Sequence, residues 1–359
     1  MPDQAADYDY AVPAGAVAQV PTARREDARL LRVPRHAVES GRAGPGWLRE
    51  ATVADLPALL RPGDLAVLNE ARVRPARLAA RRPSGGRVSV LVLDVVPDGR
   101  AATVLLGARG TPVPGETLAV AGDTWRIVRA LGEGRFEVAV AAGRDLPALL
   151  SAAGRMPLPP YIERGEEADP RDALDRERYQ TVFARAGAAT AAAAPTAGLH
   201  LTPELLAALA ARGVEVARLS LAVGEGTFRP LRGELLDEHV MHAERYEIPA
   251  EVAARFAAAR AESRRVVAVG TTVVRALESA VAPDGRTLRA GPDETALFIR
   301  PGHAFRAVDA LLTNFHQPRS TLLVLVAAFA GLATVRAAYA EAIAQGFRLF
   351  SYGDAMLLE

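Results

Sequence analysis

The chain has 359 residues, of which 50% are hydrophobic, so it can bury a large core and should hold two or three domains. Its formal net charge of +1 argues against an acidic tail and against a basic nucleic-acid footprint spread over the whole molecule. It contains no cysteine, which excludes disulfides, thiolate zinc sites and a cysteine nucleophile, so acid–base work falls to other side chains or to the substrate.

Neither the N-terminal residues nor the most apolar run predicts export or membrane insertion. The N-terminal residues Met1 to Gln4 lack a basic region followed by an apolar core, so we expect cytoplasmic residence. The most apolar run, Leu322 to Val335, is shorter than the roughly 20 residues that cross a bilayer. We therefore predict a single buried helix there and no membrane association. We also expect a monomer.

The first 70 residues predict the beginning of an α/β domain. Short apolar stretches split by prolines, up to about Arg35, indicate an extended arm that leads into a strand. Asp55 to Leu60 reads as a short helix followed by a turn, and Leu65 to Asn69 as a buried strand.

A run of short β-prone segments follows, separated by glycine- and proline-containing turns. Such even spacing is typical of a small antiparallel barrel. We place this barrel at residues 75–150, inserted into an α/β domain made of residues 1–74 and 151–359. The predicted strands are Ala76–Ala80, Val88–Val95, Ala102–Leu106, Thr117–Val120, Thr124–Ala130 and Phe136–Ala141.

Six arginines near the start of the barrel form a candidate phosphate-contacting patch. The chain contains no lysine, so arginine abundance is weak evidence, and a solvated face is the alternative. These residues are Arg72, Arg74, Arg77, Arg81, Arg82 and Arg87.

Beyond the proline-rich segment Met156 to Ile162, strands alternate with helices. The pattern predicts strands at Val214–Val223, Arg265–Val269 and Ala310–Phe315, each ending in a polar or glycine-rich loop. In a parallel sheet such loops meet at the carboxyl edge, where α/β proteins bind ligands. The fold class is therefore α/β, a mostly parallel sheet with flanking helices plus the inserted barrel.

The stretch from Asp175 to His200 collects polar groups before a helix that Thr202 can cap. An ordinary helix entry is the alternative to a binding loop. The groups in question are Arg178, Tyr179, Gln180, Thr181, Thr196, Gly198 and His200.

Two glycine-containing strand ends are further candidates. Gly224-x-Gly226, followed by Thr227, is a poor dinucleotide fingerprint because Arg229 stands at the third glycine's place, but it suits a close approach to a ligand. Thr271 and Thr272, after Gly270, can hold a carboxylate at a helix N-terminus or can simply cap the helix.

The segment Glu238 to Glu244 offers two imidazoles and two carboxylates. His239, His242 and Glu244 could in principle bind a metal. Their spacing matches no recognised zinc-hydrolase motif, so we expect no metal. A histidine oriented by a glutamate for acid–base work and a plain solvated segment both stay open.

Asn314 and His316 place an amide and an imidazole at a strand end. Ser320 can cap the helix that follows, and Asp354 can bring in a carboxylate or simply form part of a turn.

These blocks together resemble the S-adenosylmethionine:tRNA ribosyltransferase-isomerases of queuosine synthesis. They run through nearly the whole chain: 63–69, 72–73, 75–78, 156–162, 178–182, 194–200, 223–224, 226–228, 239, 241–242, 244, 269–272, 313–316, 320–322 and 350–356.

The resemblance implies an enzyme that moves and isomerises the ribosyl part of S-adenosylmethionine onto the aminomethyl-7-deazaguanine of tRNA. Adenine and methionine leave, an epoxycyclopentanediol remains, and no metal or separate cofactor takes part. By hypothesis the acid–base residues are His200, His242, Glu244 and His316. The implied substrate-binding residues are Arg178, Tyr179, Gln180, Thr196, Gly198, Gly224, Gly226, Thr227, Thr271, Thr272, Asn314, Ser320 and Asp354.

The chain departs from the family pattern at Ala28, Glu70, Ala71, Ala222 and Gln317. These changes alter hydrogen-bond demand, so two rival hypotheses stay open. One is a ribosyl transferase with a small-molecule acceptor, and the other is a catalytically inactive RNA-binding homologue.

Overall fold

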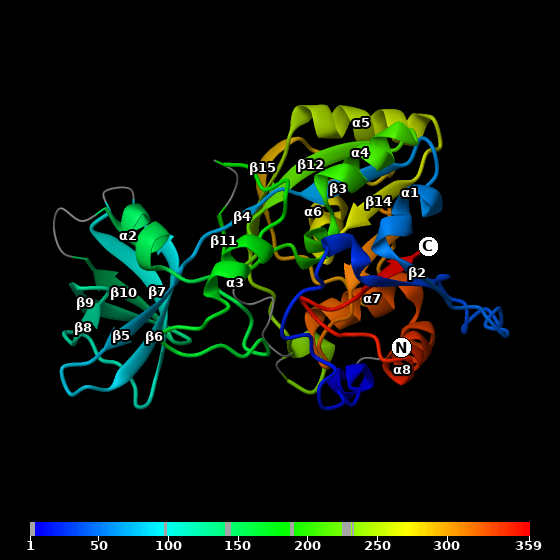
Figure 1. The fold of residues 1–359 in the computed structure, drawn as a ribbon. Coiled ribbons are helices and arrows are strands. Elements are labelled where there is room, and N and C mark those ends of the chain that lie inside the picture. The colour runs from blue at the N-terminus through cyan, green and yellow to red at the C-terminus, as the bar shows by residue number, and fades with distance from the viewer. Residues whose placement is uncertain (1–3, 97–98, 141–144, 187–189, 225–230, 232) are drawn as a thin grey trace. The chain divides into compact units, whose positions relative to one another are not determined.

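The computed structural model describes residues 4–96, 99–140, 145–186, 190–224, 231 and 233–359. The chain divides into two compact units, whose elements can be followed by residue number in Figure 1. The α/β unit comprises Met1–Arg72 and Gln180–Glu359, and the barrel unit comprises Val73–Tyr179. Residues 151–179, which the sequence-based boundary placed in the α/β domain, lie in the barrel unit.

The described residues of the α/β unit build a nine-stranded sheet in the order β15-β13-β12-β3-β14-β16-β17-β1-β2. Its centre, β12-β3-β14-β16, is parallel, whereas both flanks contain antiparallel pairs, so the predicted α/β fold is confirmed with a mixed sheet. The strands are β1 (Arg29–Val33), β2 (Arg49–Thr52), β3 (Leu65–Asn69), β12 (Glu215–Leu221), β13 (Glu244–Ile248), β14 (Val266–Val269), β15 (Gly291–Thr295), β16 (Ala310–Asn314) and β17 (Ala355–Leu358).

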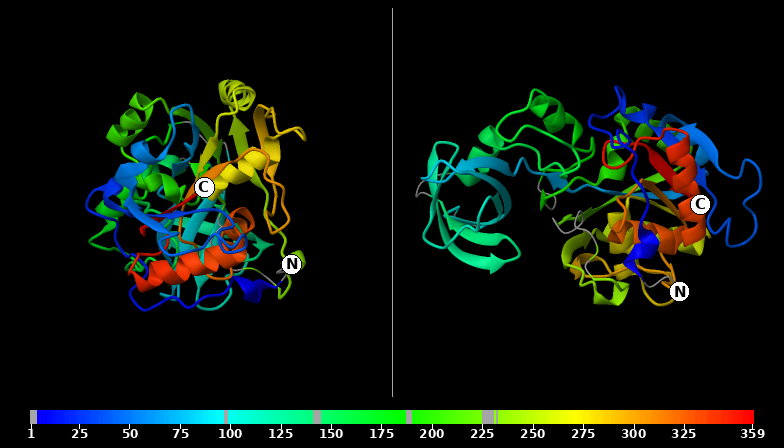
Figure 2. Two further views of the ribbon diagram at one scale, coloured as in Figure 1. Left: turned by 90° about the vertical axis from the view of Figure 1, so that its right-hand side faces the viewer. Right: turned by 90° about the horizontal axis from the view of Figure 1, so that it is seen from below.

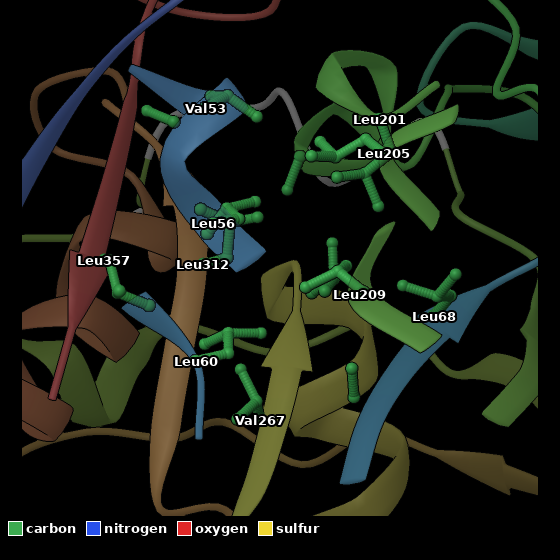
Figure 3. Close-up of a cluster of buried hydrophobic side chains, with 14 of the residues drawn as sticks. Val53, Leu56, Leu60, Leu68, Leu201, Leu205, Leu209, Val267, Leu312 and Leu357 are labelled. Carbon is green, nitrogen blue, oxygen red and sulfur yellow. The ribbon is translucent and has the colours of Figure 1, made fainter. Parts of the chain in front are cut away.

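The central strands are apolar on both faces because helices cover both. All residues of β3, β14 and β16 are buried, the pattern expected of parallel strands inside a domain. One face packs Leu68, Val267 and Leu312 against Leu56 and Leu205, as Figure 3 shows. The helices are α1 (Leu56–Leu59), α4 (Pro203–Ala211), α5 (Ala250–Ala261), α6 (Thr271–Ala280), α7 (Thr321–Ala330) and α8 (Leu332–Ala344).

Short 3-10 helices and two short strands complete the connections of the chain. They are η1 (Ala5–Tyr8), η2 (Arg25–Asp27), η3 (Val53–Asp55), η4 (Thr196–His200), η6 (Leu236–Glu238), β4 (Arg72–Val73) and β11 (Thr190–Ala191).

The apolar run that begins at Leu322 forms two helices rather than the predicted single one. Gly331 lies between α7 and α8 with φ +92°, a conformation that favours glycine. Among the described residues no single helix is long and apolar enough to cross a membrane; α7 and α8 would suffice only together, and they meet at 112°. The prediction that Ser320 caps the first helix is confirmed, since its side chain accepts a hydrogen bond from Leu323 N–H.

The barrel unit contains the predicted closed barrel, which Figure 2 shows from two further directions. Alternate residues such as Val90, Val104 and Trp125 fill its interior, as the period-2 pattern requires. Its elements are β5 (Arg77–Arg81), β6 (Arg87–Val95), β7 (Ala101–Ala108), β8 (Thr117–Val120), β9 (Asp123–Gly132), β10 (Arg135–Ala139), α2 (Leu146–Ala153) and α3 (Asp172–Arg178).

Half of the arginines in the predicted phosphate-contacting patch are neutralised by carboxylates. Arg81 pairs with Glu167, Arg82 with Glu116 and Arg87 with Glu166. Arg81, Arg82 and Arg87 therefore do not form a continuous basic surface along β5 and β6.

Candidate active site

The carboxyl ends of the four parallel strands lie at one edge of the sheet. At this edge Gly270, with φ +97°, turns the chain from β14 into α6, and its N–H donates to the carbonyl of Leu312. Thr271 and Thr272 are buried in the first turn of the helix. The Asn69 side-chain amide, at the end of β3, lies 3.3 Å from Thr272 Oγ1. Strand ends and helix N-terminus therefore form one connected structure.

Helix η4 lies against the same edge. A Cβ added at Gly270 would be 3.6 Å from Cβ of Ala197. A Cβ at Gly198 would come within 2.7 Å of the Phe183 ring and 3.0 Å of Thr181, so only glycine fits there. The predicted cap of the next helix is present as well, since Thr202 Oγ1 accepts from Leu205 N–H at 3.1 Å.

His200, at the end of η4, contacts Asn314, at the end of β16. The Asn314 amide nitrogen lies 3.1 Å from Nε2 of His200 and 3.2 Å from the carbonyl oxygen of Phe350. Because that carbonyl can only accept, the amide must be oriented as a donor, and His200 Nε2 is therefore an acceptor. Burial, with the charges of Arg348 and Arg25, lowers the pKa of His200 to about 4. The neutral imidazole thus carries its proton on Nδ1.

Two buried polar atoms near η4 have no hydrogen-bond partner in the described structure. They are Oδ1 of Asn314 and Oγ1 of Thr181, in residues that are 2% and 4% exposed. Buried polar groups are usually satisfied, and an unsatisfied one costs about 1–3 kcal/mol. These two atoms, beside a glycine-containing turn, are therefore candidates for hydrogen bonds to a ligand.

His316 is held by groups from three other parts of the chain. The ring Nε2 lies 2.8 Å from Thr313 Oγ1. The backbone N–H of His316 donates to the Tyr339 hydroxyl at 2.8 Å, and its backbone carbonyl accepts from the Tyr10 hydroxyl at 2.6 Å. Burial lowers the pKa of His316 to about 3 and raises the pKa of both Tyr10 and Tyr339. This histidine is therefore neutral and firmly positioned.

Glu244, a predicted acid–base residue, belongs to a buried ion pair. Its Oε2 pairs with the Arg275 guanidinium from α6, and its Oε1 accepts from Gly224 N–H at 2.8 Å. Both side chains are 6% exposed. The carboxylate thus joins α6, β13 and the end of β12, while His242, two residues earlier, is partly exposed.

The side chains of Ser320 and Asp354, which were predicted to bind substrate, form hydrogen bonds to the backbone instead. The Ser320 hydroxyl caps α7 and donates to the Gln317 carbonyl. The buried Asp354 carboxylate accepts the backbone N–H groups of Arg29 and Arg348 at 3.0 and 2.7 Å. Of the two interpretations of Asp354, the turn is the one that its hydrogen bonds favour.

The remaining predicted residues fall into three groups. Thr196 opens η4, Gly224 follows β12, and Gln180 begins the second segment of the α/β unit. Arg178 and Tyr179 lie at the end of α3 in the barrel unit. Gly226 and Thr227 lie outside the described residues.

Among the departures from the family pattern, Glu70 gains a partner. Its carboxylate, in a residue 5% exposed, lies 2.7 Å from Nε of Arg185, whose pKa the pair raises. The additional carboxylate at the end of β3 is thus compensated within the chain.

Sequence reasoning gave no role to two residues that the structure places at this edge. Asn69 belonged to a recognised block, and its position at a strand end was the available signal, whereas Thr181 was already among the groups of the candidate binding stretch. Arg275 had no signal, because an arginine on an apolar helix becomes notable only when its buried partner is known.

Comparisons with known proteins show the family to which the chain belongs. The family described as queuosine biosynthesis protein matches residues 5–358. The chain is 51% identical over 355 residues to the S-adenosylmethionine:tRNA ribosyltransferase-isomerase of Anaeromyxobacter sp. (strain Fw109-5), covering 98% of each chain. It is 49% identical over 353 residues to the protein of the same name from Acidithiobacillus ferrooxidans, covering 98% of this chain and 97% of the other.

Among solved structures, the crystal structure of the S-adenosylmethionine tRNA ribosyltransferase from Thermotoga maritima is similar, with a TM-score of 0.53 and 31% sequence identity. The match covers 98% of this chain and 100% of the other. This chain belongs to the family of queuosine biosynthesis proteins, and the enzyme family predicted from its sequence is thereby confirmed.

Proposed function

We propose that this protein transfers and isomerises the ribosyl moiety of S-adenosylmethionine onto the aminomethyl group of a 7-deazaguanine in tRNA, with release of adenine and methionine. Its family membership and the names of its relatives support the reaction. The observation that carries the proposal for the site is the pair of unpaired buried atoms, Asn314 Oδ1 and Thr181 Oγ1, beside η4.

The chemistry makes three demands on such a site. The positive sulfonium acidifies the neighbouring C5′ protons, so a positioned base can remove one. Adenine leaves more readily when its ring nitrogens receive hydrogen bonds or a proton, and the charges that develop need fixed dipoles around them. Each demand can be matched to side chains at the carboxyl edge.

The methionine carboxylate suits the start of α6. A helix N-terminus presents free N–H groups and a partial positive charge, which favour a bound anion. Thr271 and Thr272 add hydroxyl groups, and Asn69 fixes the orientation of the second of them.

The nucleoside suits the surroundings of η4. With Nε2 occupied by Asn314, His200 can offer Nδ1–H as a donor to an adenine nitrogen or a ribose oxygen. Asn314 Oδ1 can accept an amino or hydroxyl hydrogen, and Thr181 can do either. In this account His200 is a hydrogen-bond donor and not the base.

His242 is the best candidate for the base. Glu244 is held by Arg275, and His316 is buried, which opposes the charged form that a base becomes. His242 is partly exposed, so its protonated form can keep contact with water. We propose no metal in any of these steps.

The proposal is tested by incubating the protein with S-adenosylmethionine and one of three additions: none, small primary amines, or tRNA that carries the aminomethyl precursor. Each reaction is run with and without a chelator. We expect adenine only with the tRNA, unchanged by the chelator. Adenine with small amines alone supports the small-molecule acceptor, and tRNA binding without adenine supports the inactive homologue.

A further inference from the structure

The barrel unit contains a cavity of its own. Its volume is about 870 Å³, within the roughly 300–1,000 Å³ of pockets that bind small ligands. It lies between the outer side of β5, β6 and β7 and the segment of residues 155–167. Met156, Leu158 and Ile162, from the proline-rich block of the family pattern, line it and none of the reaction steps above uses them.

Small residues form the barrel side of this cavity. Ala79 on β5 is paired in register with Ser89 on β6, and Ser89 with Gly107 on β7. All three are exposed and alternate with the buried interior residues of their strands. A row of small side chains across three adjacent strands leaves a shallow floor that a planar group can cover.

Arg77, beside this floor, forms no ion pair with any residue that the structure describes. Arg77 lies on β5, two residues before Ala79, and therefore on the same face. Its Nη2 donates to the Leu158 carbonyl at 3.1 Å, but its buried Nε has no hydrogen-bond partner among the described residues. Burial and the neighbouring charge of Arg155 lower the pKa of Arg77.

Three of the other arginines that line the cavity form ion pairs. Arg155 pairs with Asp172 at 2.6 Å, and Arg164 pairs with Asp175 at 2.6 Å. Arg87, on the far side of the floor, pairs with Glu166 at 2.8 Å. Arg77, by contrast, is partly buried and has no acidic partner among the described residues.

We propose that this cavity binds one nucleotide of the tRNA acceptor, with its phosphate on Arg77 and its base over Ala79, Ser89 and Gly107. The inference rests on the proposed function, because it takes tRNA as the acceptor. A nucleotide matches the cavity in two respects. Its phosphate supplies a negative charge for Arg77, and the flat face of its base can stack on the floor and contact Met156 and Leu158.

The test is binding of fluorescently labelled tRNA by the full chain, without S-adenosylmethionine, at several salt concentrations. Arg77→Gln should weaken binding about tenfold or more, the effect of one charged hydrogen bond, and lower the salt slope by about one. The control is Arg126→Gln, which removes the same charge from an exposed position on β9 outside the cavity and should leave binding unchanged.

A second variant, Ser89→Trp, fills the floor without changing any charge and should also weaken binding. Thermal unfolding shows which variants are folded, and if Arg77→Gln is not, Ser89→Trp decides. Wild-type affinity in the folded variants overturns the inference. So does a cavity that binds guanosine monophosphate through Arg77 but is not blocked by tRNA.

The two proposals fail differently. A wild-type protein that neither binds tRNA nor releases adenine with precursor tRNA overturns the proposed function. A wild-type protein that does both, while the cavity variants bind tRNA equally well, overturns only the site in the barrel unit.

Discussion

Nε2 of His200 accepts a hydrogen bond of 3.1 Å from Asn314, whose amide nitrogen also lies 3.2 Å from the Phe350 carbonyl. The carbonyl fixes the amide, and the amide fixes the imidazole tautomer. A buried histidine held neutral in this way has consequences for both stability and activity.

The protein should lose stability in mildly acidic solution through His200. Its pKa falls from 6.5 to about 4 on folding, so between these values the unfolded chain binds the proton and the native protein does not. The contribution is complete above about pH 6.5 and is lost as the pH falls toward 4, a change of roughly 3 kcal/mol. Urea unfolding between pH 4 and 7 measures it.

The matched variant is His200→Gln, which keeps a polar side chain but cannot titrate. Its stability should depend less steeply on pH across this window than that of the wild type. Equal pH dependence in the two proteins would show that His200 is not buried and neutral.

Thr181→Val should separate ligand binding from stability. Removing a buried hydroxyl that has no partner should leave the free protein as stable as the wild type, or more stable by about 1 kcal/mol. If the hydroxyl contacts S-adenosylmethionine, the same change should raise KM about tenfold. Denaturant unfolding and the adenine-release assay give the two values.

The control for this variant is Thr334→Val. The Thr334 hydroxyl is also fully buried but is bonded to Glu39, so its loss should destabilise the protein without changing KM. A destabilised Thr181→Val protein with normal KM would assign Thr181 to packing alone.

The Glu244–Arg275 pair predicts strong coupling in a double-mutant cycle. Either Glu244→Leu or Arg275→Leu leaves one buried charge uncompensated and should cost about 3–5 kcal/mol. The double variant should be much less destabilised than the sum of the two. Additive effects would show that the two side chains do not form a buried pair in solution.

Gly198→Ala tests the close approach of η4 to Phe183. The added Cβ would lie 2.7 Å from the ring, so we expect a loss of about 1–3 kcal/mol, partly recovered by Phe183→Leu. Gly44→Ala is the control, because nothing lies within 4 Å of a Cβ there. An unchanged melting temperature for Gly198→Ala would contradict the packing described for η4.

Much of the fold could be predicted because local patterns and tertiary structure agree. The barrel strands follow from alternation and turn pairs, and Leu65–Asn69 is β3 to the residue. The helix break at Gly331 was missed because a glycine in an apolar run does not reveal its φ. The predicted domain boundary at residue 150 differs from the observed one at Tyr179, because the chain after Met156 packs on the barrel. This packing depends on tertiary contacts that no local sequence pattern reveals.

The candidate site shows the same division. Thr271 and Asn314 could be placed at one sheet edge from strand order, whereas His200 was recognised only as part of a polar stretch before a helix. The roles of Glu244 and Asp354 could not, because a carboxylate bound by Arg275 and one bound by backbone N–H groups look alike in sequence. Only the partners distinguish a base from a structural anion.

The fate of the ribosyl carbons tests most directly whether this protein transfers the ribosyl group to tRNA. S-adenosylmethionine labelled in those carbons is incubated with the protein and precursor tRNA, and the digested tRNA is examined by mass spectrometry. We expect the label in one modified 7-deazaguanine nucleoside, in equal amount to the adenine released. Adenine released while all label stays in small molecules would contradict it.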